Sequence, residues 1–122
     1  MSLVLLKWAN ELTTTPLDAT KGRWSRVAAM LGRQALEDAM KRLWVVTAPG
    51  VQDSSMRAQL LCLGTYADDE LADRVSYAYA ELTRACHHHP YELSPTAGEI
   101  TGWLGDVAAL IEKVDPTAPG NS

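Results

Sequence analysis

The chain has 122 residues, of which 47% are hydrophobic, and a formal net charge of −4 at pH 7. This size predicts one domain with a single core that needs no metal or disulfide to hold it together. The negative net charge excludes a protein that coats nucleic acid through bulk positive charge. We expect residues 1–114 to form one helical domain and residues 115–122, which contain two prolines and a glycine, to form a disordered tail.

Charge is unevenly distributed along the chain. Residues 1–50 contain seven basic and four acidic residues, whereas residues 51–122 contain four basic and eleven acidic residues. This asymmetry predicts ion pairs between helices or between subunits, and it leaves a modest basic surface that is either a solvated helix face or an RNA-binding strip. That surface consists of Arg23, Arg26, Arg33, Lys41 and Arg42.

The cysteines and the hydropathy of the chain predict its location. Cys62 and Cys86 both fall within predicted helices. We expect no signal peptide, because no basic segment followed by a long apolar one precedes them, and Leu3–Leu6 is too short for a membrane span. We therefore expect a reduced, cytoplasmic protein that does not enter a membrane.

The first two predicted helices cover residues 3–12 and 19–47. The first is very apolar and must pack against the rest of the domain, because it would otherwise expose a contiguous hydrophobic patch. The second carries apolar residues three or four apart over its whole length, in a stripe so broad that we expect burial on two sides. Ala48-Pro49-Gly50 ends it.

Three further helices are predicted near residues 54–64, 68–88 and 96–114. Asp53-Ser54-Ser55 offers caps for the first of them. The last begins either with Ser94 as cap before Pro95 or with a capping box from Thr96 to Glu99.

No segment alternates with period two over a useful length, so strands are not expected. The prediction is an all-α protein, an up-and-down antiparallel bundle of about five helices. All four tryptophans fall on apolar stripes and are predicted to be core: Trp8, Trp24, Trp44 and Trp103.

Gly98, Gly102 and Gly105 share one line of the last helix. Each interior glycine costs roughly 1 kcal/mol relative to alanine. We therefore expect another helix to approach closely along this line.

The helix near residues 68–88 carries two lines of side chains. An apolar line faces the core, while Tyr77, Glu81, Arg84 and His88 form a polar and aromatic line at the same spacing. The helix ends in the stretch from Arg84 to Pro90, which contains all three histidines of the chain, because proline cannot continue a helix.

Several chemistries suit this stretch. A metal site would need two further ligands, and the chain has no other histidine, so no metal or other cofactor is predicted. A nucleophilic Cys86 is disfavoured because the negative end of a helix dipole raises a thiol pKa. Arg84 with His89 could instead present a guanidinium, a proton donor and a proton acceptor to a phosphodiester. In the structural interpretation, Arg84 pairs either with Glu81 or with Glu92 across the turn, and the histidines cap helix carbonyls.

An arginine, four residues and a histidine at the end of a long helix, followed by a turn and a final amphipathic helix, resemble the HEPN superfamily (higher eukaryotes and prokaryotes nucleotide-binding). The stretch Leu31-Gly32-Arg33-Gln34-Ala35-Leu36-Glu37 also looks like bacterial members of that group, and the similarity covers about residues 24–114. The resemblance implies that Arg84 and His89 line a cleft at a homodimer interface and cut RNA without metal. Ala85 departs from the pattern, since active members usually have a polar residue after the arginine.

The resemblance implies an RNA- or nucleotide-binding protein, and specifically a metal-independent endoribonuclease of toxin or defence type. In this interpretation Arg84 and His89 are catalytic, and His88, His87, Glu81 and Tyr77 contribute to binding. The implied partners are a second copy of the chain, RNA or a nucleotide, and an antitoxin or other protein. The alternative is a non-catalytic, dimerising or partner-binding helical module with a structural histidine cluster.

Overall fold

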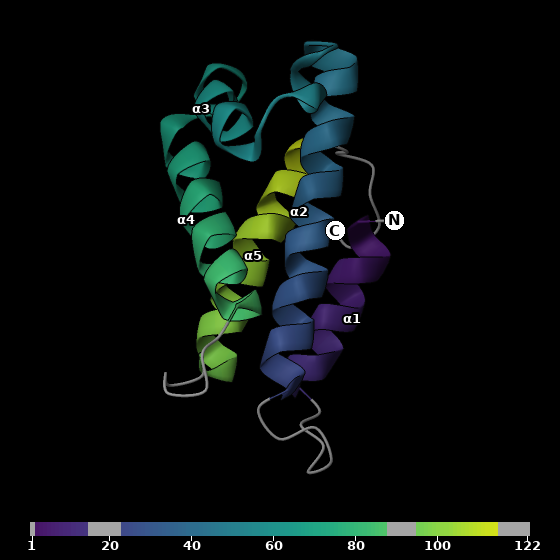
Figure 1. Ribbon diagram of the computed structural model, residues 1–122, viewed down its shortest axis with the longest axis vertical. Coiled ribbons are helices and arrows are strands. Elements are labelled where there is room, and N and C mark those ends of the chain that lie inside the picture. The colour runs from purple at the N-terminus through teal and green to yellow at the C-terminus, as the bar shows by residue number, and fades with distance from the viewer. Residues whose placement is uncertain (1, 15–22, 88–94, 115–122) are drawn as a thin grey trace.

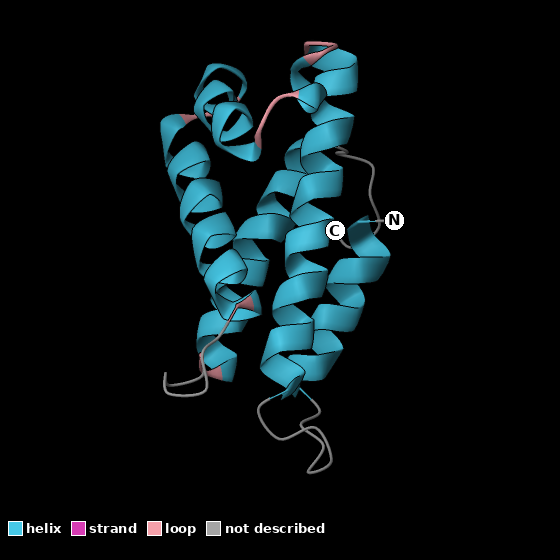
Figure 2. Ribbon diagram, in the orientation of Figure 1, coloured by secondary structure: helices cyan, strands magenta, loops and turns pink. Residues whose placement is uncertain are grey.

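The computed structural model describes residues 2–14, 23–87 and 95–114, which form five α-helices and one short 3₁₀ helix and contain no strand (Figure 1 and Figure 2). The all-α prediction is therefore confirmed. The predicted tail, residues 115–122, lies outside the described residues. The elements are α1 (Ser2–Thr14), α2 (Arg23–Thr47), η1 (Val51–Asp53), α3 (Met56–Tyr66), α4 (Asp69–Cys86) and α5 (Ala97–Val114).

Four long helices form an up-and-down bundle. Helices α2 and α5 run in one direction, and α1 and α4 run in the other (Figure 1). Helices α2 and α5 pack against each other and against both α1 and α4, so α1 and α4 lie on opposite sides of this central pair. The predicted burial of the long helix on two sides is confirmed.

The helix starts follow from local capping. Ser55 Oγ accepts a hydrogen bond from the Ala58 amide at 3.2 Å, which caps α3. Asp68 Oδ1 accepts from the Leu71 amide at 2.7 Å, which caps α4. Thr96 and Glu99 form the predicted capping box before α5, with two reciprocal bonds of 3.0 Å.

Helix α3 is the short helix that crosses one end of α4, and a buried glutamine fixes its position. Gln59 Oε1 accepts a hydrogen bond from the indole Nε1 of Trp44 at 3.0 Å. Its Nε2 donates to the carbonyl oxygens of Gln52 and Ser54, at 3.3 and 2.8 Å. A buried amide is stable only when it is hydrogen-bonded, so this network ties α3 to the turn after α2.

The tryptophan prediction is partly wrong. Trp44 and Trp103 are buried, but Trp8 is 53% exposed, and the side chain of Trp24 lies outside the described part of the structure. Helix α1 buries only the face that carries Leu6 and Ala9. Its apolar residues outnumber the positions that α2 and α5 can cover, which leaves Trp8 in solvent. No described helix is both long and apolar enough to span a bilayer.

The predicted close packing along the glycine line of α5 is also wrong. A Cβ built at Gly102 or Gly105 meets no atom of the described residues within 4 Å, and one at Gly98 meets only the Thr96 hydroxyl at 3.9 Å. The close approach occurs instead at Gly32 in α2. A Cβ there would lie 2.5 Å from Leu104 Cδ2 of α5. The tight contact of the bundle is thus made by α2 and not by the glycine face of α5.

We expect Gly32→Leu to lower the free energy of unfolding by about 1–3 kcal/mol, because the new side chain overfills a packed contact. Gly102→Ala is the opposite case and should raise stability by up to about 1 kcal/mol, since alanine is the better helix former. Urea unfolding followed by circular dichroism measures both changes. An unfolding midpoint of Gly32→Leu equal to that of the parent would contradict the close packing.

Candidate functional site

The predicted polar line occupies the outward side of α4 near its C-terminal end. Tyr77 is 59% exposed, and Glu81 and Arg84 follow it at helical spacing. Arg84 Nη1 lies 3.9 Å from Glu81 Oε2, and the Arg84 side chain is 71% exposed. The last residue described on this helix end is His87, which is exposed and whose amide donates to the Arg84 carbonyl at 3.1 Å.

His88 and His89 lie outside the described residues. The catalytic pair that the resemblance implies therefore has one described member, Arg84. The ion pair with Glu81 is one of the two contacts that the structural interpretation offered, and the other candidate, Glu92, lies outside the described residues. The roles of Arg84 and His89 in catalysis, and of His88 and His87 in binding, remain predictions.

The inward side of the same helix end meets charged residues of α2. Cys86 is two residues beyond Arg84, about 200° around the helix, and so points away from it. Burial raises the pKa of the Cys86 thiol above its ordinary value of 9.0. Arg33 opposes this pKa rise, Glu37 adds to it and Arg26 opposes it, so these three charged residues of α2 act on the thiol.

An ion pair of α2, formed by Arg33 and Glu37, acts on both Cys86 and Tyr79. Tyr79 lies two turns before Cys86 on α4. Arg33 Nε is 3.6 Å from Glu37 Oε1. Burial, followed by the Glu37 carboxylate, raises the pKa of the Tyr79 phenol above 10.0, while Thr83 and then Arg33 oppose the rise and Cys86 adds to it. We call Arg26, Arg33, Glu37, Tyr79 and Cys86 the α2–α4 cluster.

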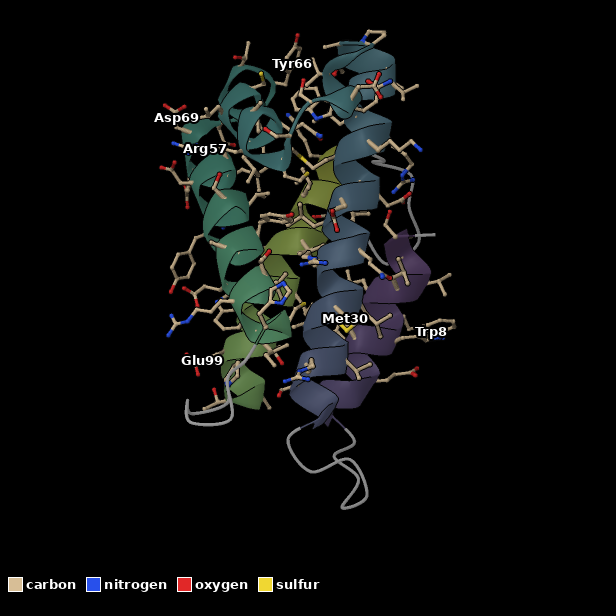
Figure 3. All side chains as sticks on the ribbon, in the orientation of Figure 1. Trp8, Met30, Arg57, Tyr66, Asp69 and Glu99 are labelled. Carbon is tan, nitrogen blue, oxygen red and sulfur yellow. The ribbon has the colours of Figure 1, made fainter. Side chains whose placement is uncertain are left out.

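A groove of about 450 Å³ opens beside this cluster, where α3 crosses α4. Figure 3 labels Arg57 near the upper end of α4, and Arg57 is one of the residues that line this groove. Leu61 of the groove is 77% exposed. Tyr79 belongs both to the groove and to the α2–α4 cluster. The residues that line the α3–α4 groove are Arg57, Leu60, Leu61, Ser76, Tyr79, Ala80 and Thr83.

The sequence identified some of these residues but did not predict that α2 and the end of α4 bring them close together. Arg26 and Arg33 belonged to the predicted basic surface, and Arg33 and Glu37 have the spacing of a helical ion pair. Nothing in the spacing indicated that they face the end of α4. In the described part of the chain, no three metal-ligating side chains come together.

No model of a known protein family, no curated protein and no solved structure matches this chain.

The pKa of Cys86 measures whether Arg33 and Glu37 really face it. In a Cys62→Ala background, Arg33→Gln should raise the Cys86 pKa further, because a positive charge that favours the thiolate is lost. Glu37→Gln should lower it. The pH dependence of the rate of alkylation by iodoacetamide reports this pKa.

Lys41→Gln is the matched control, since Lys41 is an exposed cation on the same helix that exerts no resolved effect on Cys86. Equal Cys86 pKa values in the Arg33 and Lys41 variants would contradict the described α2–α4 geometry.

Proposed function

We propose that this chain binds the phosphate groups of RNA or of a nucleotide at the C-terminal end of α4. One observation carries the proposal: arginines flank that helix end on both sides. Arg84 lies on the outward side. On the inward side, Arg33 of α2 follows Gly32, where a Cβ would lie 3.5 Å from Leu82 of α4. Guanidinium groups bind phosphate through charge-assisted and often bidentate hydrogen bonds.

The histidines fit the same proposal. His87 is exposed at the helix end, between the outward and inward sides of α4, and His88 and His89 follow it in sequence. An imidazole N–H can donate a hydrogen bond to a phosphate oxygen.

The finer form of the proposal is the one that the HEPN resemblance implies, a metal-independent endoribonuclease of toxin or defence type. A base takes the proton of a ribose 2′-hydroxyl, whose oxygen attacks the adjacent phosphorus. The bond to the 5′ oxygen breaks, and an acid protonates that leaving oxygen. His89 is the proposed acid or base, and Arg84 stabilises the charge that develops on phosphate. A two-fold homodimer would supply this pair twice in one cleft.

The second candidate is a non-catalytic module that binds a protein, such as an antitoxin, or a second copy of the chain. The Glu81–Arg84 ion pair and the hydrogen bond from the His87 amide to the Arg84 carbonyl favour it. In that case the groups at the C-terminal end of α4 bind one another, and the histidine cluster only stabilises the helix. The two candidates differ in whether anionic ligands bind at all.

Binding of a fluorescein-labelled single-stranded RNA, followed by anisotropy at low salt, tests the proposal. We expect Arg33→Gln to weaken binding by roughly 10- to 100-fold, the usual range for a lost hydrogen bond to a charged group. Lys41→Gln removes the same charge elsewhere on α2 and should weaken binding by less than about threefold. Affinity should fall as salt rises, as counterion release requires.

Equal losses in the Arg33 and Lys41 variants would show that only diffuse charge attracts RNA. The absence of RNA and nucleotide binding would favour the partner-binding module. The catalytic part is tested separately by incubating RNA with the protein in EDTA. His89→Ala or Arg84→Ala should slow cleavage about 10²–10⁴-fold, and the products should end in cyclic phosphate. If RNA binds but is not cleaved, the proposed phosphate site is supported and the proposed nuclease activity is refuted.

A further inference from the structure

The α3–α4 groove has the size and chemistry of a small-ligand site. Its volume of about 450 Å³ lies within the range of 300–1,000 Å³ that is usual for ligand pockets. Leu60 and Leu61 form one apolar wall, and Ala80 and the Tyr79 ring belong to the other. The Ser76 hydroxyl is among the few polar groups that line it. Such a site suits a flat, largely apolar ligand with polar edges.

The groove leads toward the proposed phosphate site. Tyr79 and Thr83 of its lining lie two turns and one turn before the end of α4, so the middle of the groove is roughly 10 Å from Cys86. Arg33 follows Gly32 of α2, where a Cβ would lie 3.5 Å from both terminal methyl groups of Leu82. Leu82 lies between Tyr79 and Cys86 on α4, so Arg33 belongs to the part of α2 that packs against this stretch. A ligand that fills the groove can extend an anionic group to Arg33.

We propose that the α3–α4 groove binds a nucleobase whose own phosphate is held by Arg33 and the end of α4. The inference rests on the proposed function, because it needs a phosphate there. Bases bind proteins by stacking on aromatic and apolar side chains and by hydrogen bonds at their edges. Tyr79 and the leucines supply the first kind of contact, and the Ser76 hydroxyl supplies the second.

The competing occupant is an amphipathic helix of a protein, for which the exposed Leu61 would be a contact. Charge favours the nucleotide. Arg57 lines the groove, and Arg33 follows Gly32, which packs against Leu82 of α4. These cations favour an occupant that carries an anionic group on an otherwise largely apolar body. The groove also follows α4 for only two turns, from Ser76 to Thr83.

Titration calorimetry with nucleoside monophosphates and with ribose 5-phosphate tests the inference, because the two ligands share the phosphate and differ in the base. The parent protein should bind at least one nucleoside monophosphate roughly 5- to 150-fold more tightly, the equivalent of the 1–3 kcal/mol that stacking of one base contributes. Ala80→Leu, which fills the groove, should abolish this preference and leave binding of ribose 5-phosphate unchanged.

Thr101→Leu is the control, since it adds similar bulk at an exposed position of α5 and should keep the preference. Repeating the comparison with a trinucleotide RNA shows whether a free nucleotide or an RNA strand is the better ligand. The inference is wrong if the parent binds both small ligands equally, or if Ala80→Leu keeps the preference. In both cases the phosphate site itself stands.

If neither nucleoside monophosphates nor ribose 5-phosphate nor RNA binds, the proposed function fails and the inference fails with it. Light scattering of the same variants tests whether the groove is instead occupied by a second copy of the chain. A loss of self-association in Ala80→Leu, with the base preference intact, would assign the groove to an interface between copies of the chain and overturn the inference.

Discussion

The close approach of α2 to α4 and α5 at Gly32 is the contact on which the rest of the structure depends. A Cβ at this position would lie 2.5 Å from a methyl group of Leu104 and 3.5 Å from both terminal methyl groups of Leu82. To relieve such an overlap in a densely packed interior, either the buried Leu104 side chain must change conformation or the helices must move apart. With glycine there, side chains of both α4 and α5 reach the backbone of α2, and the three helices close around one core.

This contact also determines what lies at the surface. Arg33 follows Gly32 directly, and Glu37 is one turn further along α2, so the packing that brings α4 inward brings these charges against Tyr79 and Cys86. The binding surface that we propose is therefore a consequence of core packing. A helix end that carries Arg84 alone would be a sparse anion site, and in our proposal Arg33 of the neighbouring α2 adds a second guanidinium to it.

The helices could be predicted from the sequence because their causes are local. Apolar spacing and capping by Ser55 or Thr96 act within a few residues. Burial depends on neighbours that are distant in sequence, and this is why the predictions failed for Trp8 and for the glycine line of α5. For the same reason, the sequence did not predict that Arg33 lies near the end of α4. The apolar spacing around Gly32 predicted a buried helix but not which helices would cover it.

Backbone amide shifts in ¹⁵N-labelled protein, titrated with a single-stranded RNA trinucleotide, test the central claim most directly. If the surface between α2 and α4 binds RNA, the largest shift changes should fall on Arg33, Tyr79 and His87 and extend into the α3–α4 groove, at Ala80. Residues on the far side of the bundle, such as Val4 and Trp8 of α1, should not shift. Changes confined to α1, or no changes at millimolar RNA, would contradict the account.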